Sequence, residues 1–274
     1  MDTTPLYAVI GHPVAHSKSP AIHRAFAAQT GHALDYILLE GTPGGFAAAV
    51  DAFRARGGLG LNVTAPFKLD AFRYATGLDA DAREAGAVNC LAFEPDGQVS
   101  GANYDGVGLL RDIEHNLRVP LRGKRVLLLG AGGAARGALR PLLAARPAEL
   151  VVANRTQARA AALLEPFAGQ AVSAAGLNSV PGRFDVVINA TSASMDAAPL
   201  PLPDAAFAPG CLAYDMVYGR GLTPFLRRGK EAGAALLADG VGMLVEQAAE
   251  AFARWRSVRP LTQDVIRALT VPLA

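Results

Sequence analysis

Short apolar runs alternate with longer amphipathic segments along almost the whole chain, and glycines separate many of them. The apolar runs Leu6–Ile10, Leu34–Leu39 and Gly60–Val63 are typical of strands, whereas Pro20–Gln29 and Gly45–Ala55 have the spacing of helices. Such alternation is characteristic of βαβ units, in which helices connect parallel strands. The pattern therefore predicts an α/β protein.

A second alternating series begins after Pro120. Its glycine-rich segments and apolar runs are spaced as in a doubly wound parallel sheet. We expect strands at Arg125–Leu129, Leu150–Ala153, Phe184–Asn189 and Cys211–Val217, helices at Ala134–Ala144 and Met243–Ser257, and before them a hairpin of Asn89–Phe93 and Gln98–Ala102. The helical segment Asp105–Leu117 connects the two series, so we expect one domain over 1–104 and a second over 105–240.

Composition narrows the class of protein. With 51% hydrophobic and 18% charged residues among 274, the chain is too apolar to be disordered, and a net charge of +2 disfavours nucleic acid as a partner. The two cysteines, Cys90 and Cys211, lie far apart and form no Cys-x-x-Cys motif, which favours a reducing compartment. No basic, apolar leader and no apolar run of about 18 residues is present, so we expect a soluble cytoplasmic protein.

A glycine-rich turn follows the strand Arg125–Leu129 and opens the next helix with the pattern G-x-G-x-x-A. In this context Gly130 permits a tight turn and Gly132 leaves room for a pyrophosphate. Ala135 allows close packing of helix against strand, and the free N–H groups of the helix start face the anion. The segment predicts a dinucleotide site.

The end of the next strand distinguishes the two nicotinamide dinucleotides. An acidic residue there binds the ribose hydroxyl of NAD, whereas a cation suits the 2′-phosphate of NADP. The chain has Asn154, Arg155 and Thr156 at this place and no acid. Arg155 offers a planar fork that matches phosphate oxygens, so NADP is the expected cofactor. The alternative is a solvated arginine beside a helix-capping Thr156.

Reduction of a carbonyl also requires a proton donor. The sequence contains no Cys/His cluster that could hold zinc, so we expect no metal site and we expect the proton donor to be a side chain. Candidate side chains occur in three polar stretches, at 11–20, 62–68 and 86–106. Each has an ordinary structural explanation when taken singly. Ser19 and Asp105 suit helix starts, Lys68 suits a solvated helix surface, and Asn89 suits a turn.

Together these stretches resemble the shikimate dehydrogenases, a family of NADP-dependent enzymes. The resemblance runs nearly end to end and in the same order, through GHPVAHSKSPAIHRAF, NVTAPFK, GAVN, GANYDGVG, GAGGAARG, NRT, NATS, YDMVYGRGLTPFL and DGVGMLVEQAAEAF. It implies reversible reduction of 3-dehydroshikimate to shikimate, in the pathway to chorismate and the aromatic amino acids. It also implies an N-terminal substrate domain, a Rossmann-type NADP domain, a C-terminal segment 241–274 that returns to the substrate domain, and a monomer or homodimer without metal.

The resemblance further implies roles for individual residues. Lys68 and Asp105 correspond to the catalytic acid–base pair. The residues that correspond to substrate contacts are Ser17, Ser19, Thr64, Lys68, Asn89, Asp105, Tyr218 and Gln247. Those that correspond to NADP contacts are Gly130, Ala131, Gly132, Gly133, Ala134, Asn154, Arg155, Thr156, Thr191, Met216 and Gly240.

Two positions depart from the family pattern, because Tyr104 and Cys90 stand where threonines are usual. Both are next to expected substrate contacts. Three alternatives remain open from the sequence: a quinate/shikimate dehydrogenase that also accepts NAD, a non-catalytic NADP-binding sensor, and a purely structural α/β domain. Ser19 and Arg155 favour the strict shikimate enzyme, and the presence of both Lys68 and Asp105 disfavours the sensor.

Overall fold

The computed structural model describes residues 4–194, 200–219 and 221–273. The chain divides into two compact units: unit 1 comprises Met1–Gly108 and Val245–Val265, and unit 2 comprises Leu109–Leu244 and Ile266–Ala274. The three changes between units fall within helices α5 (Asp105–Arg111), α9 (Val241–Arg256) and α10 (Gln263–Leu269). The sequence suggested changes at 105 and 241, and it grouped the C-terminal residues from 266 onward with the first unit.

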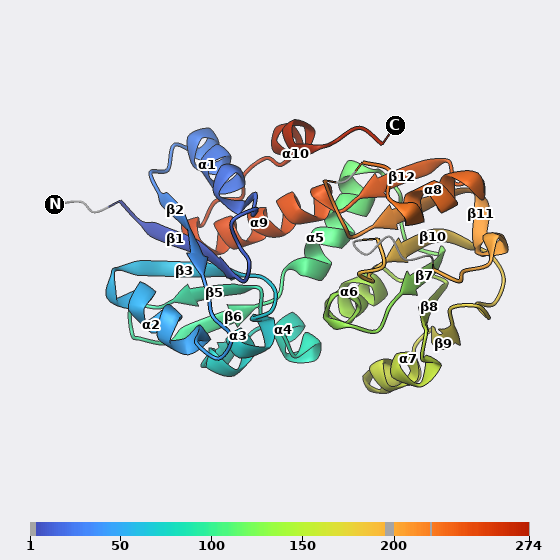
Figure 1. The fold of residues 1–274 in the computed structure, drawn as a ribbon, viewed down its shortest axis with the longest axis horizontal. Coiled ribbons are helices and arrows are strands. Elements are labelled where there is room, and N and C mark those ends of the chain that lie inside the picture. Colours follow the sequence, from blue (N-terminus) through green and yellow to red (C-terminus); the bar gives the residue numbers. More distant parts are fainter. Residues whose placement is uncertain (1–3, 195–199, 220, 274) are drawn as a thin grey trace. The chain divides into compact units, whose positions relative to one another are not determined.

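Unit 1 contains a mixed sheet of six strands (Figure 1). The strands are β1 (Leu6–Gly11), β2 (Asp35–Glu40), β3 (Gly58–Val63), β4 (Gly77–Leu78), β5 (Cys90–Phe93) and β6 (Val99–Ala102). Their order is β2-β1-β3-β5-β6-β4. β1 pairs in parallel with β2 and β3, whereas β5 is antiparallel to β3 and β6. The β5–β6 pair is the hairpin that the turn sequence predicts.

Helices cover both faces of this sheet, because successive apolar side chains along its strands point to opposite faces. The unit 1 helices other than α9 are α1 (Ser19–Thr30), α2 (Phe46–Ala55), α3 (Lys68–Tyr74) and α4 (Ala80–Ala85). Ala8 and Ile10 of β1 belong to a core with α2, α3 and α4. Tyr7 and Val9 instead pack with Trp255 of α9. This alternation is the period of two expected of a strand that is buried on both faces.

Unit 2 contains a second sheet, which is wholly parallel. Its strands are β7 (Arg125–Leu129), β8 (Glu149–Asn154), β9 (Val172–Gly176), β10 (Phe184–Asn189), β11 (Phe207–Asp215) and β12 (Leu236–Asp239). Their order, β12-β11-β10-β7-β8-β9, is the doubly wound order of dinucleotide-binding folds (Figure 1). The direction of winding reverses between β7 and β10, where such sheets bind their ligands.

The helical segments of unit 2 cover this sheet on both faces. The α-helices are α6 (Gly133–Ala144), α7 (Gln157–Leu164) and α8 (Pro224–Glu231). The shorter segments are a π-helical turn (Asp112–Asn116) and two 3-10 turns (Glu165–Phe167 and Asp204–Ala206). The last helix, α10 (Gln263–Leu269), lies near the C-terminus. α6 and α7 share one apolar core with the sheet, and α8 shares another. Both cysteines are buried and free.

One expected helix changes character partway. The segment predicted as Asp105–Leu117 is α-helical to Arg111 and then widens into the π-helical turn. The widening begins at Asp112, whose buried carboxylate accepts a hydrogen bond from Tyr214 Oη at 2.7 Å. None of the helices in the described ranges has the length and apolar character needed to cross a membrane.

Gly60 of β3 supplies a test of how α9 packs on the sheet of unit 1. A Cβ at this position would lie 2.4 Å from Trp255 Nε1 and 2.9 Å from the Leu91 carbonyl oxygen. We expect Gly60→Ala to lower the free energy of unfolding by about 2 kcal/mol, because the partly buried indole of Trp255 has to move. Denaturant unfolding followed by fluorescence of Trp255, the single tryptophan of the chain, measures this.

Gly77→Ala in β4 is the matched control, since a Cβ there meets no atom within 4 Å. Its unfolding free energy should stay within about 0.5 kcal/mol of the wild type. Equal effects of the two substitutions would contradict the packing of Trp255 described here.

Candidate active site

One edge of the unit 1 sheet collects most of the expected substrate residues. β1 and β3 are parallel and end side by side, with Ile10 opposite Val63. β5 runs the other way, so Asn89, which precedes it, lies at the same edge and accepts a hydrogen bond from Val63 N at 2.8 Å. β6 ends opposite the start of β5, with Ala102 opposite Cys90. Loops from four strands therefore meet at this edge.

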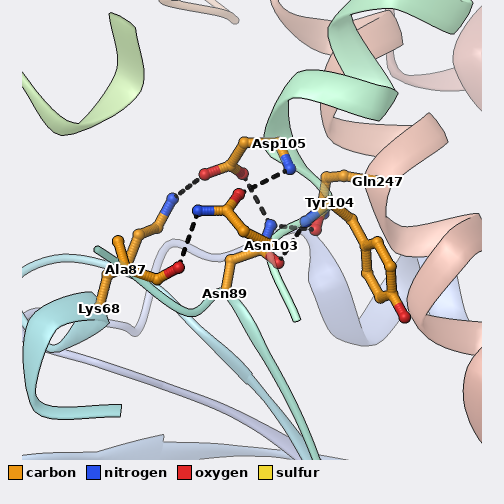
Figure 2. A network of polar contacts seen from close by, with 7 residues as sticks. All are labelled: Lys68, Ala87, Asn89, Asn103, Tyr104, Asp105 and Gln247. Carbon is orange, nitrogen blue, oxygen red and sulfur yellow. Dashed lines mark hydrogen bonds and ion pairs between the residues drawn. The ribbon is translucent and has the colours of Figure 1, made fainter. Parts of the chain in front are cut away.

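Lys68 and Asp105 form an ion pair at this edge (Figure 2). Lys68 is the first residue of α3 and Asp105 the first of α5, and Nζ lies 2.5 Å from Oδ2. The other carboxylate oxygen, Oδ1, accepts a hydrogen bond from Asn89 Nδ2 at 2.8 Å. The side chain of Lys68 is 34% exposed and that of Asp105 is 14% exposed. The pair is therefore oriented by the fold but remains accessible to a ligand.

The buried amide of Asn89 links this pair to two further residues. Asn89 Oδ1 accepts from the Tyr104 backbone N–H at 2.9 Å, and Nδ2 lies 3.4 Å from Gln247 Oε1 of α9. These contacts fix which end of the amide faces Asp105. Asn103 adds a second buried amide: its Oδ1 accepts from Asp105 N at 3.1 Å and its Nδ2 donates to the Ala87 carbonyl at 3.0 Å. The structure thus brings Lys68, Asn89, Asp105 and Gln247 together in one polar network.

Ser17 lies in the loop after β1, Ser19 begins the helix that follows this loop, and Thr64 comes directly after β3. Ser17 Oγ donates to Ser19 Oγ at 3.2 Å and accepts from Ser19 N at 3.3 Å. Ser19 is the first residue of α1, and Lys18 holds the capping position without a side-chain hydrogen bond, so the simple capping explanation of Ser19 is wrong. The half-buried Thr64 donates its backbone N–H to the Ile10 carbonyl at 3.0 Å.

A buried polar cluster beneath these serines was missed by sequence reasoning. It consists of His23, Tyr36 and Asn62. Tyr36 Oη donates to Asn62 Oδ1 at 2.7 Å, and His23 Nε2 lies 3.0 Å from the same oxygen. The His23 ring stacks on Tyr36 with centroids 4.3 Å apart. Through His23, the cluster therefore connects α1, which begins at Ser19, to β2 and β3.

Burial lowers the pKa of His23 to about 3, so its ring is neutral and donates from Nε2 to Asn62. With Oδ1 occupied by two donors, the Nδ2 of Asn62 is a buried donor without a partner among the described residues. An unsatisfied buried donor costs about 1–3 kcal/mol, which favours a ligand or water as its partner. The sequence contained an indication that Asn62 belongs to the site, because Asn62 and Thr64 are two residues apart at the end of a strand and so lie on the same face.

The two departures from the family pattern lie together, away from Lys68. Tyr104 packs against Cys90, Ala102 and Ala251, and Figure 2 shows its ring turned away from Lys68. Cys90 and Tyr104 line a pocket of about 340 Å³ with Arg254. Burial raises the pKa of both the Cys90 thiol and the Tyr104 phenol. Only the backbone N–H of Tyr104 takes part in the polar network, so the larger side chain leaves that network intact.

The glycine turn of unit 2 has the geometry that a pyrophosphate requires. Gly130 has a φ of +110°, which favours glycine, and its N–H donates to the Ala153 carbonyl at 2.8 Å. Gly132 caps α6, and as a glycine it offers no side chain to the N–H groups of the first turn. A Cβ on Gly132 or Gly133 would meet nothing within 4 Å, and Ala131 and Ala134 lie alongside at the surface. These residues fit a dinucleotide.

Asn154, Arg155 and Thr156 lie at the carboxyl end of β8, next to this turn. Asn154 Nδ2 donates to the Thr156 carbonyl at 2.9 Å, which holds the loop closed. Arg155 is exposed and forms no hydrogen bond or ion pair with the residues that the structure describes. Thr156 caps α7 by position, although its side chain makes no capping bond. The free guanidinium fits a phosphate on the ribose of a dinucleotide.

Three more expected cofactor residues follow the next strands of the same sheet. Thr191 follows β10, and its N–H and Oγ1 both donate to Asn189 Oδ1, at 3.1 and 2.7 Å. Met216 follows β11 and donates its N–H to the Asn189 carbonyl at 3.0 Å. Gly240 follows β12, where a Cβ would lie 2.2 Å from the Met216 carbonyl oxygen. All therefore lie at the carboxyl edge of the sheet, as does Gly130.

Tyr218 is the one expected substrate residue in unit 2. It lies beyond the end of β11 and is 37% exposed. The seven other expected substrate residues belong to unit 1. In the described ranges, no group of three or more histidine, cysteine and acidic side chains is arranged to hold a metal ion.

Three family models match the chain. Residues 9–91 match the shikimate dehydrogenase substrate binding domain, and residues 113–197 match shikimate / quinate 5-dehydrogenase. Residues 240–270 match the shikimate 5′-dehydrogenase C-terminal domain. The first match covers the edge with Lys68 and Asn89, and the second covers the glycine turn and Arg155.

Full-length relatives agree with these matches. The chain is 56% identical to shikimate dehydrogenase (NADP(+)) of Laribacter hongkongensis, over 99% of this chain and 100% of that one. The crystal structure of an Ael1 enzyme from Pseudomonas putida is 54% identical, with a TM-score of 0.95 and coverage of 99% and 100%. Shikimate 5-dehydrogenase of Thermus thermophilus, in complex with NADP(H) and shikimate, is 33% identical, with a TM-score of 0.85 and coverage of 97% and 98%.

The buried, neutral His23 predicts a pH dependence of stability. Its pKa is about 3 in the folded protein and about 6.5 when unfolded, so between these values the unfolded chain binds a proton that the folded chain does not. This group therefore removes stability as the pH falls below 6.5, by up to about 1.4 kcal/mol per pH unit. His23→Gln keeps an N–H donor for Asn62 but does not titrate.

We expect the free energy of unfolding of the wild type to fall relative to that of His23→Gln by roughly 2–3 kcal/mol between pH 7 and pH 4.5. Urea unfolding followed by Trp255 fluorescence at each pH measures the difference. A difference that stays constant over this range would show that His23 is not buried in the neutral form.

Proposed function

The chain belongs to the shikimate dehydrogenase family, and from this premise we propose that it catalyses the reversible, NADP-dependent interconversion of shikimate and 3-dehydroshikimate. The observation that carries the proposal is the Lys68–Asp105 pair, oriented by Asn89 and left accessible at a polar sheet edge. The names of the relatives specify NADP(+), and the Thermus structure contains NADP(H) and shikimate. The reaction is a step in aromatic amino-acid biosynthesis.

The polar groups at the unit 1 edge suit a small acid with several hydroxyls. Ser17 and Ser19 offer hydroxyls for a carboxylate, and Tyr218 of unit 2 is proposed to complete that site. Thr64, Asn89 and Gln247 are proposed to contact ring hydroxyls. To these we add the unpaired Asn62 Nδ2. A site that hydrogen-bonds each hydroxyl rejects analogues that lack one, because a buried polar group is then left unpaired.

Lys68 is proposed to move the proton. In the reducing direction its ammonium stabilises the negative charge that develops on the substrate oxygen and then donates a proton to it. Asp105 balances the charge of the ammonium and, held by Asn89 at Oδ1, keeps Nζ in a fixed position. In the oxidising direction the same lysine accepts the hydroxyl proton. Acid–base assistance of this kind contributes about 10²–10⁴ in rate.

Unit 2 is proposed to hold NADP, and unit 1 the substrate. The glycine turn and the first turn of α6 suit the pyrophosphate, and Arg155, with Asn154 and Thr156 beside it, suits the 2′-phosphate. NADP, when bound, supplies the hydride or accepts it. The two reduced, buried cysteines support a cytoplasmic location. We propose that the enzyme acts there as a monomer or homodimer.

A four-way assay tests the proposed function. Purified protein is supplied with shikimate or quinate, each with NADP or NAD, and nicotinamide absorbance is followed. We expect kcat/KM to be highest for shikimate with NADP, because Arg155 favours the 2′-phosphate and Ser19 favours the strict shikimate enzyme. Comparable use of quinate or NAD would indicate a broader quinate/shikimate dehydrogenase. Binding of NADP without turnover would indicate the sensor.

Replacement of the proposed proton donor separates catalysis from binding. We expect Lys68→Ala to lower kcat by about 10²–10⁴ while the KM for shikimate changes by less than about tenfold, since the ammonium acts mainly in the transition state. Lys124→Ala is the matched control, because Lys124 also faces an aspartate, Asp185, but at the amino end of the unit 2 sheet. Undiminished kcat in Lys68→Ala would overturn the assignment.

A further inference from the structure

Asp215, the last residue of β11, is fully buried and accepts four hydrogen bonds. Its Oδ1 accepts from Asn189 Nδ2 at 3.0 Å and from Val217 N at 3.2 Å. Its Oδ2 accepts from Ser194 Oγ and Thr223 Oγ1, both at 2.6 Å. The donors come from the end of β10, the loop after β10, the loop after β11 and the start of α8. One carboxylate therefore joins four segments of unit 2.

Two of these segments carry expected cofactor residues. Asn189, which donates to Asp215, uses its own Oδ1 to hold the N–H and Oγ1 of Thr191. Ser194, three residues after Thr191, also donates to Asp215. On the other side, the Asp215 bond to Val217 N fixes the backbone on either side of Met216. Asp215 thus holds the loop of Thr191 through Asn189 and Ser194, and it holds the backbone around its neighbour Met216 through the bond to Val217 N.

The carboxylate is costly to keep at this position. All four of its donors are uncharged, and in the described part of the chain no lysine or arginine forms an ion pair with it. Burial raises the pKa of Asp215 despite these four hydrogen bonds. A buried acid without a cation is retained only where its hydrogen bonds have a use that an apolar side chain cannot provide. Joining four polar segments is such a use.

The position of Asp215 in the sheet assigns it to one half of the cofactor. A doubly wound sheet binds a dinucleotide across its switch point, one mononucleotide on each side. The glycine turn after β7 and Arg155 after β8 take the pyrophosphate and the adenosine ribose, so the nicotinamide half falls over β10, β11 and β12. Asp215 lies on β11, between β10 and β12.

We propose that Asp215 is a positioning residue for the nicotinamide half of NADP, acting through the loops that contain Thr191 and Met216. The inference rests on the proposed function for the identity of the cofactor. It predicts that loss of the Asp215 hydrogen bonds weakens binding of the whole dinucleotide but not of its adenosine half. A residue that only stabilises unit 2 would affect both ligands alike.

Asp215→Asn is the main variant. The asparagine keeps Oδ1 for Asn189 and Val217, but its Nδ2 replaces the oxygen that receives both hydroxyl hydrogens. Thr223 Oγ1 already accepts from Leu226 N, so its hydrogen is left without a partner. We expect the Kd for NADP to rise about tenfold, and the Kd for adenosine 2′,5′-bisphosphate to change less than twofold, by titration calorimetry.

Two further variants make the measurement decisive. Ser194→Ala removes two hydrogen bonds of the loop after β10, those with Asp215 and Asn189, and should raise the Kd for NADP alone, about threefold, even if Asp215→Asn fails to fold. Asp185→Asn is the matched control, since Asp185 also lies on the unit 2 sheet and accepts from Arg125 N, at the amino end of β10. It should leave both dissociation constants unchanged.

The proposal is supported if the Kd for NADP rises in Asp215→Asn or Ser194→Ala while the Kd for adenosine 2′,5′-bisphosphate does not. An equal rise for both ligands, or no rise for either, overturns it while wild-type turnover of shikimate with NADP still supports the function. If the wild type binds neither NADP nor adenosine 2′,5′-bisphosphate, the proposed function and the positioning role are both wrong.

Discussion

Parallel pairing of strands is the constraint on which both candidate sites depend. Parallel neighbours end at the same edge of a sheet, so the polar residues that follow them are brought together even when they are far apart in sequence. In unit 2 this brings Gly130, Arg155, Thr191 and Met216 to one edge. In unit 1 the antiparallel β5 contributes to the same effect, because its amino end lies beside the carboxyl end of β3 and carries Asn89.

Hydrogen-bonded carboxylates fix the positions of the polar groups at these edges. Asp105 divides its oxygens between Lys68 and Asn89, and Asp215 divides its oxygens among four uncharged groups. The two carboxylates have different roles. Asp105 is only partly enclosed and paired with a cation, which suits a group that faces a reacting ligand. Asp215 is fully enclosed and joins segments of backbone, which suits a group that acts through others.

How much of the structure the sequence predicts depends on how far apart the interacting residues are along the chain. Long periodic elements and the glycine turn were foreseen because their signals are local, as for β7 and α6. The short α3 and α4 span fewer than about two turns each and leave no clear period. The resemblance supplied Lys68, Asn89 and Asp105, but the His23–Tyr36–Asn62 cluster needs contacts between residues 26 to 39 positions apart. The Asp215 network likewise depends on tertiary pairing.

The substitutions at 104 and 90 show how a site tolerates change beside its reacting groups. Tyr104 enters the polar network only through its backbone N–H, a group that every residue except proline possesses. Its ring packs against Cys90 and Ala251 and lines the pocket that also contains Arg254, so a side chain at this position has to fit that space. A change from threonine to tyrosine there alters packing against α9 while Asn89 keeps its orientation. The constraint on this position is therefore one of space, and that on Asn89 and Asp105 is one of hydrogen-bond geometry.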